Sequence, residues 1–449
     1  MEEKDWDIQD AIDAFERRDI QEAFDLFEFG ANLGNSTAKA RLGEMYQHGV
    51  LGLNDPARAV ELFQEAAKDG ETSAMSSLGY LFATGTFVNQ DLNVAREWFS
   101  KGAELGDANA QCDLGRIYRE GLGVPVDHHI ALKWYEKAEV QGNAEARFRL
   151  AEMYEHGEGV EKDIRRSLAL YMSSAEDGCP SAQARYGAIL ETGIYLEADH
   201  RAAVEWYRKA AYNDFPYAYS LLGNMYFSGQ GVEQDYDRAV ELFRKAAKAG
   251  NPSGQYNLGL CLLHGLGVEQ DLEEASHWVL HAAQQNHTDA LVHAGKFALQ
   301  GIGIPKDPKQ GFEMFNAASD AGSVEGIRLT GYCFENGVGT EKDESAAFTY
   351  YSRAALSDDA SSLFSLGACY EYGIGTEIDY PQAIKAYSTS AQEGFASAQF
   401  NLALMLINEI GIKRDLDIGR QLLELAADQG HEGARAALLQ LPPLGQKPH

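Results

Sequence analysis

The sequence predicts an all-α protein built as a helical solenoid, and three periodic features support this prediction. A small residue, always Gly or Ala, recurs every 36 residues in eleven copies without insertion or deletion. A glycine-rich turn follows this residue, and an aspartate then precedes a second apolar stretch in every copy. Because strict internal periods of about 20–50 residues are typical of stacked repeat units, we expect eleven helix-turn-helix repeats.

The recurring small residue, called the anchor below, lies within the first predicted helix of each repeat. Leu precedes it in eight of eleven copies, and an aromatic or aliphatic residue usually follows three positions later. These three positions share one helix face, and a small anchor lets a neighbouring helix approach closely. The anchors are Gly43, Gly79, Gly115, Ala151, Gly187, Gly223, Gly259, Gly295, Gly331, Gly367 and Ala403.

The second helix of each repeat has predicted start and stop signals. Glycine stands six positions after the anchor in ten of eleven copies, which indicates a helix end with positive φ. Aspartate stands twelve positions after every anchor, from Asp55 to Asp415, and is expected to cap the second helix. That helix closes on Gly, Asn or Asp, which tolerate left-handed backbone. Leu51, Phe87, Tyr195 and Glu409 replace turn glycines, so the turn geometry of their copies is left open.

The repeat unit resembles the Sel-one-like repeat (SLR), a relative of the tetratricopeptide repeat. Residues 110–142 and 218–250 carry its pattern best: Ala-x-Ala, Leu-Gly-x-x-Tyr, Gly-x-Gly-Val, Asp and a final aromatic pair. The resemblance covers residues 38–430. It implies helix pairs stacked into a right-handed superhelix, and a role as a non-catalytic scaffold or adaptor that needs no cofactor.

Three segments are expected along the chain. Residues 1–37 form a degenerate N-terminal capping half-repeat, because residues 8–34 match the second helix without its preceding turn glycines. Residues 38–430 form eleven repeats in one continuous solenoid. Residues 431–449 form a C-terminal capping helix and a loose tail, since Pro442 and Pro443 stop the helix.

The amino-acid composition limits the classes of partner that we expect the protein to bind. The formal net charge of −30 disfavours nucleic acid and anionic lipid, and it favours a basic protein or peptide. We expect no membrane insertion, because no stretch approaches the about 20 apolar residues of a membrane span. The N-terminus has no secretory pattern, and five scattered cysteines are no disulfide framework, so we expect a cytoplasmic protein. The sequence leaves the oligomeric state open.

The candidate binding surface is assigned by analogy with tetratricopeptide arrays, in which the first helices line a groove. Positions −3, +1 and +4 from the anchor are charged in early copies, such as Arg119 and Glu155. They become largely apolar in the middle copies, where exposed apolar residues would bind a partner. Packing between first helices is the alternative explanation, and both stay open. The candidate partner-binding residues are Phe227, Tyr256, Leu260, Leu263, Val292, Lys296 and Leu299.

No residue is predicted to be catalytic or to bind a metal or cofactor. Cys261, Cys333 and Cys369 occupy an apolar position of the repeat, so we expect buried thiols. His277 and His281 have a spacing that could hold zinc, but they replace exposed Glu and Lys of another copy. The turn glycines follow no strand and precede no Gly-Lys-Ser/Thr, which excludes a phosphate-binding loop.

The predicted function is therefore a non-catalytic scaffold that holds a partner in the groove of the solenoid. One alternative is a regulatory or inhibitory partner of a basic effector protein, which the negative charge permits. A β-lactamase-like hydrolase is a weaker alternative. Relatives discussed in that role resemble secreted chains with paired cysteines in every repeat, and this sequence has neither feature.

Overall fold

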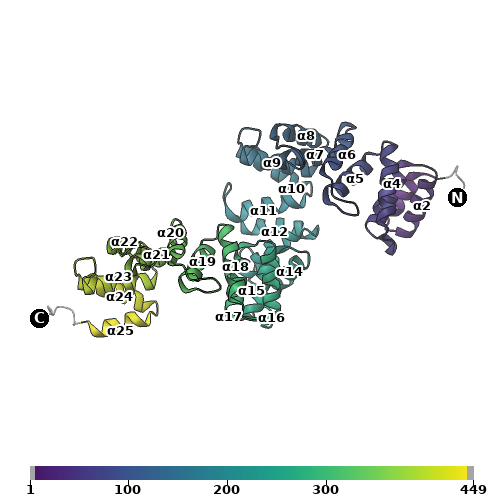
Figure 1. Cartoon of the computed structure of the whole chain (residues 1–449). Coiled ribbons are helices and arrows are strands. Elements are labelled where there is room, and N and C mark those ends of the chain that lie inside the picture. Colours follow the sequence, from purple (N-terminus) through teal and green to yellow (C-terminus); the bar gives the residue numbers. More distant parts are fainter. Residues whose placement is uncertain (1–5, 442–449) are drawn as a thin grey trace. The chain divides into compact units, whose positions relative to one another are not determined.

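The computed structural model describes residues 6–441, and all regular secondary structure in that range is helical. The chain divides into two compact units, one ending at Phe215 and one beginning at Pro216. Successive helices pack against one another within each unit (Figure 1). The all-α solenoid fold with a 36-residue period is thereby confirmed.

The first unit contains two helices before the first complete repeat, followed by helix pairs. Its elements are α1 (Ile8–Glu16), α2 (Ile20–Asn32), α3 (Ser36–Gln47), the 3-10 turn η1 (Val50–Gly52), α4 (Pro56–Lys68), α5 (Thr72–Thr84), α6 (Leu92–Glu104), α7 (Ala108–Glu120), α8 (His128–Val140), α9 (Ala144–His156), α10 (Ile164–Glu176), α11 (Pro180–Thr192) and α12 (His200–Tyr212).

The second unit continues the same pattern and ends with an unpaired helix. Its elements are α13 (Pro216–Ser228), α14 (Tyr236–Lys248), α15 (Pro252–His264), α16 (Leu272–Gln284), α17 (Thr288–Gln300), α18 (Pro308–Asp320), α19 (Val324–Asn336), α20 (Glu344–Ala355), α21 (Ala360–Tyr372), α22 (Tyr380–Gln392), α23 (Ala396–Asn408), α24 (Leu416–Asp428) and α25 (Glu432–Gln440).

The anchor glycines explain how closely the two helices of a repeat approach. A Cβ added to Gly115 on α7 would lie 2.7 Å from the ring of Tyr135 on α8. At Gly295 on α17 the corresponding distance to Phe315 on α18 is 2.5 Å. Real side chains do not pack this closely, so larger residues at these anchors would push the helix pair apart.

The predicted caps are confirmed. Each aspartate of the series accepts a hydrogen bond from a backbone N–H in the first turn of its second helix: Asp55, Asp91, Asp127, Asp163, Asp199, Asp235, Asp271, Asp307, Asp343, Asp379 and Asp415. Left-handed backbone also follows the second helices, including Asp214, Asn286 and Asp358 with φ of 52°, 60° and 53°. Local hydrogen bonding and backbone geometry thus define every unit of the repeat.

The four copies that lack one of the two turn glycines behave in two ways. Leu51, Phe87 and Glu409 adopt the left-handed conformation that glycine would take, with φ of 57°, 65° and 58°. Tyr195 does not have positive φ, and its hydroxyl instead donates a hydrogen bond of 3.2 Å to Glu155. Three residues that do not favour left-handed backbone therefore keep the turn conformation found at the glycines of the other copies.

The terminal segments contain helices where the sequence predicts capping elements. Residues 1–37 include α1 and α2, and residues 431–449 include α25. The predicted loose tail beyond Leu441 lies outside the described residues. The capping role of both segments, and the continuity of one solenoid through residues 38–430, stay predictions.

Candidate partner-binding surface

One pair of positions decides the character of the first-helix face, which we define by positions −3, +1 and +4 from each anchor. Position +4 on the first helix meets position +20 on the second. In four repeats these positions hold Glu and Tyr, and the tyrosine hydroxyl donates to the carboxylate at 2.5–2.7 Å. The pairs are Glu155–Tyr171, Glu191–Tyr207, Glu335–Tyr351 and Glu371–Tyr387. These pairs were not predicted, although Glu and Tyr recur together sixteen residues apart in the sequence.

The apolar stretch of the face occupies the same pair of positions. From α13 to α18, position +4 holds Phe227, Leu263 and Leu299 in successive repeats. Phe227 lies against Phe243, with ring centroids 6.5 Å apart, and Leu263 packs on the core formed by α16–α18. Leu299 lies over Gly311, where an added Cβ would be 2.7 Å from its Cδ2. These three side chains are half-buried, so they help to hold the helix pair together and also contribute surface.

Val292 is a correction to the predicted surface. It is only 2% exposed and belongs to a core cluster with Val279, Leu291 and Phe297. Tyr256 and Leu263 of α15 pack against this cluster. Packing between neighbouring repeats therefore removes Val292 from solvent, and the residue cannot contact a partner on the folded protein.

Tyr256 is held in place by two histidines of the next repeat. Its ring stacks on His287 at 4.9 Å between centroids, and its hydroxyl lies 3.2 Å from Nδ1 of His293. His287 also caps α17, since its Nδ1 accepts from the backbone N–H of Ala290. Burial raises the pKa of Tyr256 to about 12 and lowers the pKa of His287. Tyr256 is thus a fixed, half-buried part of the first-helix face.

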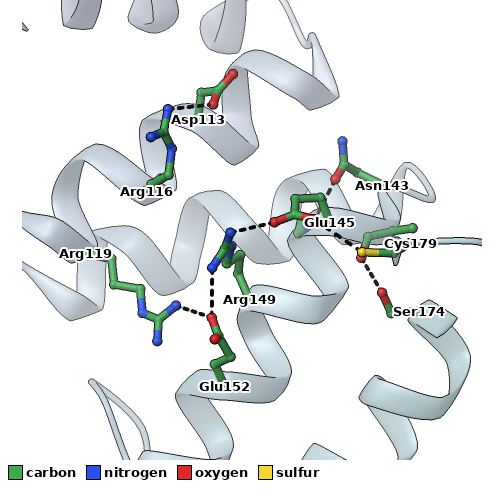
Figure 2. Close-up of polar contacts among 11 residues, drawn as sticks. Asp113, Arg116, Arg119, Asn143, Glu145, Arg149, Glu152, Ser174 and Cys179 are labelled. Atoms are coloured by element: carbon green, nitrogen blue, oxygen red, sulfur yellow. Dashed lines mark hydrogen bonds and ion pairs between the residues drawn. The ribbon is translucent and has the colours of Figure 1, made fainter. Parts of the chain in front are cut away.

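The first-helix face of α7 and α9, in the first unit, carries paired charges instead. Arg119 of α7 donates to Glu152 at 2.5 Å and to Glu158 at 2.7 Å. Arg149 of α9 donates to the same Glu152 at 3.1 Å and to Glu145 at 2.8 Å. Figure 2 shows both arginines pointing toward Glu152 from neighbouring first helices. These arginine and glutamate side chains form ion pairs with one another, so fewer of them are available to bind a partner.

Two repeats depart from the simple Tyr–Glu pair. Glu155 accepts from two further donors besides its tyrosine, whereas Tyr135 lacks the glutamate. Glu155 is 2% exposed and accepts from Tyr171, Tyr195 and Arg185. Burial by itself would raise the pKa of Glu155, but these donors bring the net shift below the usual value. Tyr135 has Arg119 at position +4 in place of Glu. Its fully buried hydroxyl has no hydrogen-bond partner among the described residues.

A groove opens on the first-helix face between α17 and α19 and includes two of the predicted residues. It has a volume of about 720 Å³ and is lined by Lys296 and Leu299 of α17 together with Leu329 and Tyr332 of α19. Phe315 of α18 forms part of its floor. We call this feature the α17–α19 groove. Leu260 of α15, at position +1, is half-buried and occupies the same repeat position as Lys296 and Tyr332.

The residues considered for chemistry lie apart from one another. All five cysteines are buried free thiols, and burial raises the pKa of Cys261 and Cys333 to about 11. His277 and His281 are exposed on α16 with ring centroids 4.4 Å apart. Within residues 6–441, no three His, Cys, Asp or Glu side chains come together in a way that could hold a metal ion. Over the same range, no helix combines the length and the apolar character needed to span a bilayer.

Comparison with known families gives a match along nearly the whole chain. The Sel1 repeat model matches twelve stretches: residues 14–35, 36–71, 72–107, 108–143, 144–179, 180–215, 216–251, 252–287, 288–323, 324–359, 360–395 and 396–431. The chain belongs to the Sel1 repeat family. The resemblance inferred from the repeat pattern is confirmed, and the match adds a repeat at residues 14–35, within the segment that the sequence analysis treated as degenerate.

The solved structure of a similar chain agrees with this assignment. The protein is similar to c5321, described as a protective antigen of uropathogenic Escherichia coli strains displaying an SLR fold. The two share 26% identity and a TM-score of 0.62, over 94% of this chain and 91% of that one. A Sel1 repeat protein from Oxalobacter formigenes shares 28% identity over 68% of this chain and 89% of that chain, with a TM-score of 0.48. No curated protein matches the chain.

Proposed function

We propose that this Sel1 repeat protein is a non-catalytic scaffold or adaptor that holds a partner protein or peptide on the first-helix face of α13–α19. The observation that carries the proposal is the change at position +4. The paired charges and Tyr–Glu pairs of α7–α12 give way to Phe227, Leu263 and Leu299 in α13–α17, and Tyr–Glu pairs return in α19–α22. An apolar face that is half-buried and flanked by polar positions is typical of protein interaction surfaces.

The remaining candidate residues complete this surface. Leu260 and Lys296 lie at position +1 of successive first helices, and Tyr256 is fixed beside them by His287 and His293. Tyr332, at the same position of the next repeat, is 44% exposed. Tyrosine contributes a large contact area with few rotatable bonds, which favours binding.

The chemistry of the cysteines supports a non-catalytic role. A thiol is a good nucleophile only as a thiolate, and burial raises the pKa of these groups well above neutral pH. The free thiols also favour a reducing compartment, so we place the protein in the cytoplasm.

The net charge favours a basic partner as a second, finer proposal. A chain with 68 acidic and 38 basic residues attracts a basic protein at long range, and salt screens that attraction. A partner that binds through charge would lose affinity steeply as ionic strength rises. An affinity that does not change with ionic strength would contradict this proposal. The apolar first-helix face would then be the main source of the binding energy.

The scaffold proposal is tested by affinity purification from the native cell lysate followed by mass spectrometry. The variant Leu260→Glu/Tyr332→Glu places charges on the surface without removing the half-buried residues at position +4. Its matched control is Leu356→Glu/Leu425→Glu, two residues 83% and 52% exposed at the C-terminal end of α20 and on α24, which are second helices. We expect a partner that wild type and control retain and the first variant loses. Equal retention by all three proteins would contradict the proposed surface.

A further inference from the structure

The α17–α19 groove differs from the rest of this acidic chain in its charge. Its lining includes the lysines Lys296 and Lys306 and no carboxylate residue. The other lining side chains named above are apolar or aromatic. With a net charge of −30, most of the protein surface would repel a carboxylate. The α17–α19 groove is positive and apolar, so it can accept both a carboxylate and an apolar side chain.

The two lysines differ in how firmly they are held. Lys296 donates to Glu325 at 2.8 Å, but both side chains are partly exposed, at 35% and 46%. An ion pair in contact with water contributes little stability, so Lys296 can exchange Glu325 for another carboxylate at small cost. Lys306 is exposed and makes no ion pair with any described residue. The groove therefore has one lysine, Lys306, with no ion pair among the described residues and one, Lys296, whose ion pair is partly exposed to water.

The walls of the groove are set by tight backbone packing rather than by loose side chains. The turn after α19 contributes Gly337, Val338 and Gly339 to the lining. A Cβ added to Gly339 would lie 2.0 Å from the carbonyl oxygen of Pro308, so this turn lies directly on the start of α18. On the other side, Gly311 lets Leu299 pack down onto α18. Because these contacts are rigid, a ligand would find the groove already formed, which lowers the entropic cost of binding.

We propose that the α17–α19 groove binds an extended acidic segment of the partner protein, with one large apolar side chain seated between Leu299, Leu329 and Tyr332. An Asp or Glu side chain next to that apolar residue pairs with Lys306 and Lys296. This inference rests on the proposed scaffold function and adds the chemistry of the bound segment. It is compatible with a partner that is basic as a whole, since the groove contacts only one short stretch of it.

The test uses a phage-displayed library of random dodecapeptides selected on the full-length protein. We expect selected peptides to carry Asp or Glu beside a large apolar residue. Their affinity should fall by about tenfold or more in the variant Lys296→Glu/Lys306→Glu, because the lysines then become like charges. The control Lys248→Glu/Lys413→Glu makes the same change in net charge at exposed positions elsewhere in the second unit and should bind like wild type.

Several outcomes would overturn the inference. These are the absence of enrichment, enrichment of basic peptides, and equal binding by the Lys296/Lys306 variant. Circular dichroism checks that each variant is folded, and the single substitution Lys306→Ala provides a milder test, since this exposed side chain makes no ion pair. If the lysate partner is lost by Leu260→Glu/Tyr332→Glu but retained by the lysine variant, the scaffold function stands and only the acidic-segment inference fails.

Discussion

Helices α7–α11 and α13–α17 belong to the same 36-residue helix-pair repeat, yet their first-helix faces differ in chemistry. At position +4 the former has Arg119, Glu155 and Glu191, whose charges are bound by neighbouring side chains. The latter has Phe227, Leu263 and Leu299, which pack on the second helix and stay partly exposed. Small anchors and the aspartate caps of the second helices occur in both regions. The comparison shows that the residue types at positions +4 and +20 differ together between the two regions, whereas the helix-pair backbone is the same.

The largest expected effect comes from breaking the buried pair at Glu155. The substitution Glu155→Leu leaves the buried hydroxyl of Tyr171 without an acceptor, and we expect a loss of about 1–3 kcal/mol of stability. Adding Tyr171→Phe converts the pair to the Leu–Phe combination of Leu299 and Phe315. We expect this second change to restore part of the loss, as measured by thermal unfolding in a double-mutant cycle.

The matched cycle uses Glu371 and Tyr387, which form the same pair in the second unit with a hydrogen bond of 2.7 Å. If the two losses at Glu155 and Tyr171 simply add, without recovery in the double variant, positions +4 and +20 are independent. That result would remove the basis of the comparison between the two faces.

A smaller effect of opposite sign is expected at Tyr135. Among residues 6–441 its buried hydroxyl has no partner: Arg119 stands where other repeats have a glutamate acceptor, and its N–H groups donate to Glu152 and Glu158. The substitution Tyr135→Phe removes a polar group that is costly to bury, and we expect unchanged or increased stability, by up to about 1–2 kcal/mol. The same substitution at Tyr387, whose hydroxyl donates to Glu371, should lower the melting temperature. Equal destabilisation of both variants would contradict the assigned role of Arg119.

The smallest effect concerns pH and compares two caps at the same repeat position, His287 of α17 and Asn143 of α9. Burial lowers the pKa of His287 in the folded protein below its usual 6.5. The folded state then binds fewer protons than the unfolded state, so this contribution is complete above pH 6.5 and is lost as the pH falls through the lowered pKa. Asn143 caps α9 at the equivalent repeat position and does not titrate.

The substitution His287→Asn should therefore flatten the decrease in melting temperature between neutral and mildly acidic pH. The charged groups near His287 to be considered are Asp289 on α17, which opposes the lowered pKa, and His293 beyond Tyr256. An unchanged pH profile in the variant would show that His287 does not contribute to the acid sensitivity of the second unit.

Much of the fold could be predicted from residues close together in the sequence. Asp127 caps α8 and Gly121 ends α7 through hydrogen bonds and φ values that depend on a few neighbouring residues. The period of 36 residues repeats these local signals eleven times, so each confirms the others. The candidate surface was harder to predict, because the same residue type at position −3 or +4 serves as core or as surface.

Val292 and Tyr256 occupy the same position of adjacent repeats, yet Val292 is buried and Tyr256 is only half-buried. The sequence by itself determined the helix pairs, their caps, their turns and the repeat family, since these follow from local backbone geometry and strict periodicity. Only tertiary packing determined which apolar residues stay accessible, that the Tyr135 hydroxyl has no partner within the described part of the chain, and where the α17–α19 groove opens. Those properties depend on side chains that neighbouring helices bring together, and repeat position alone does not specify them.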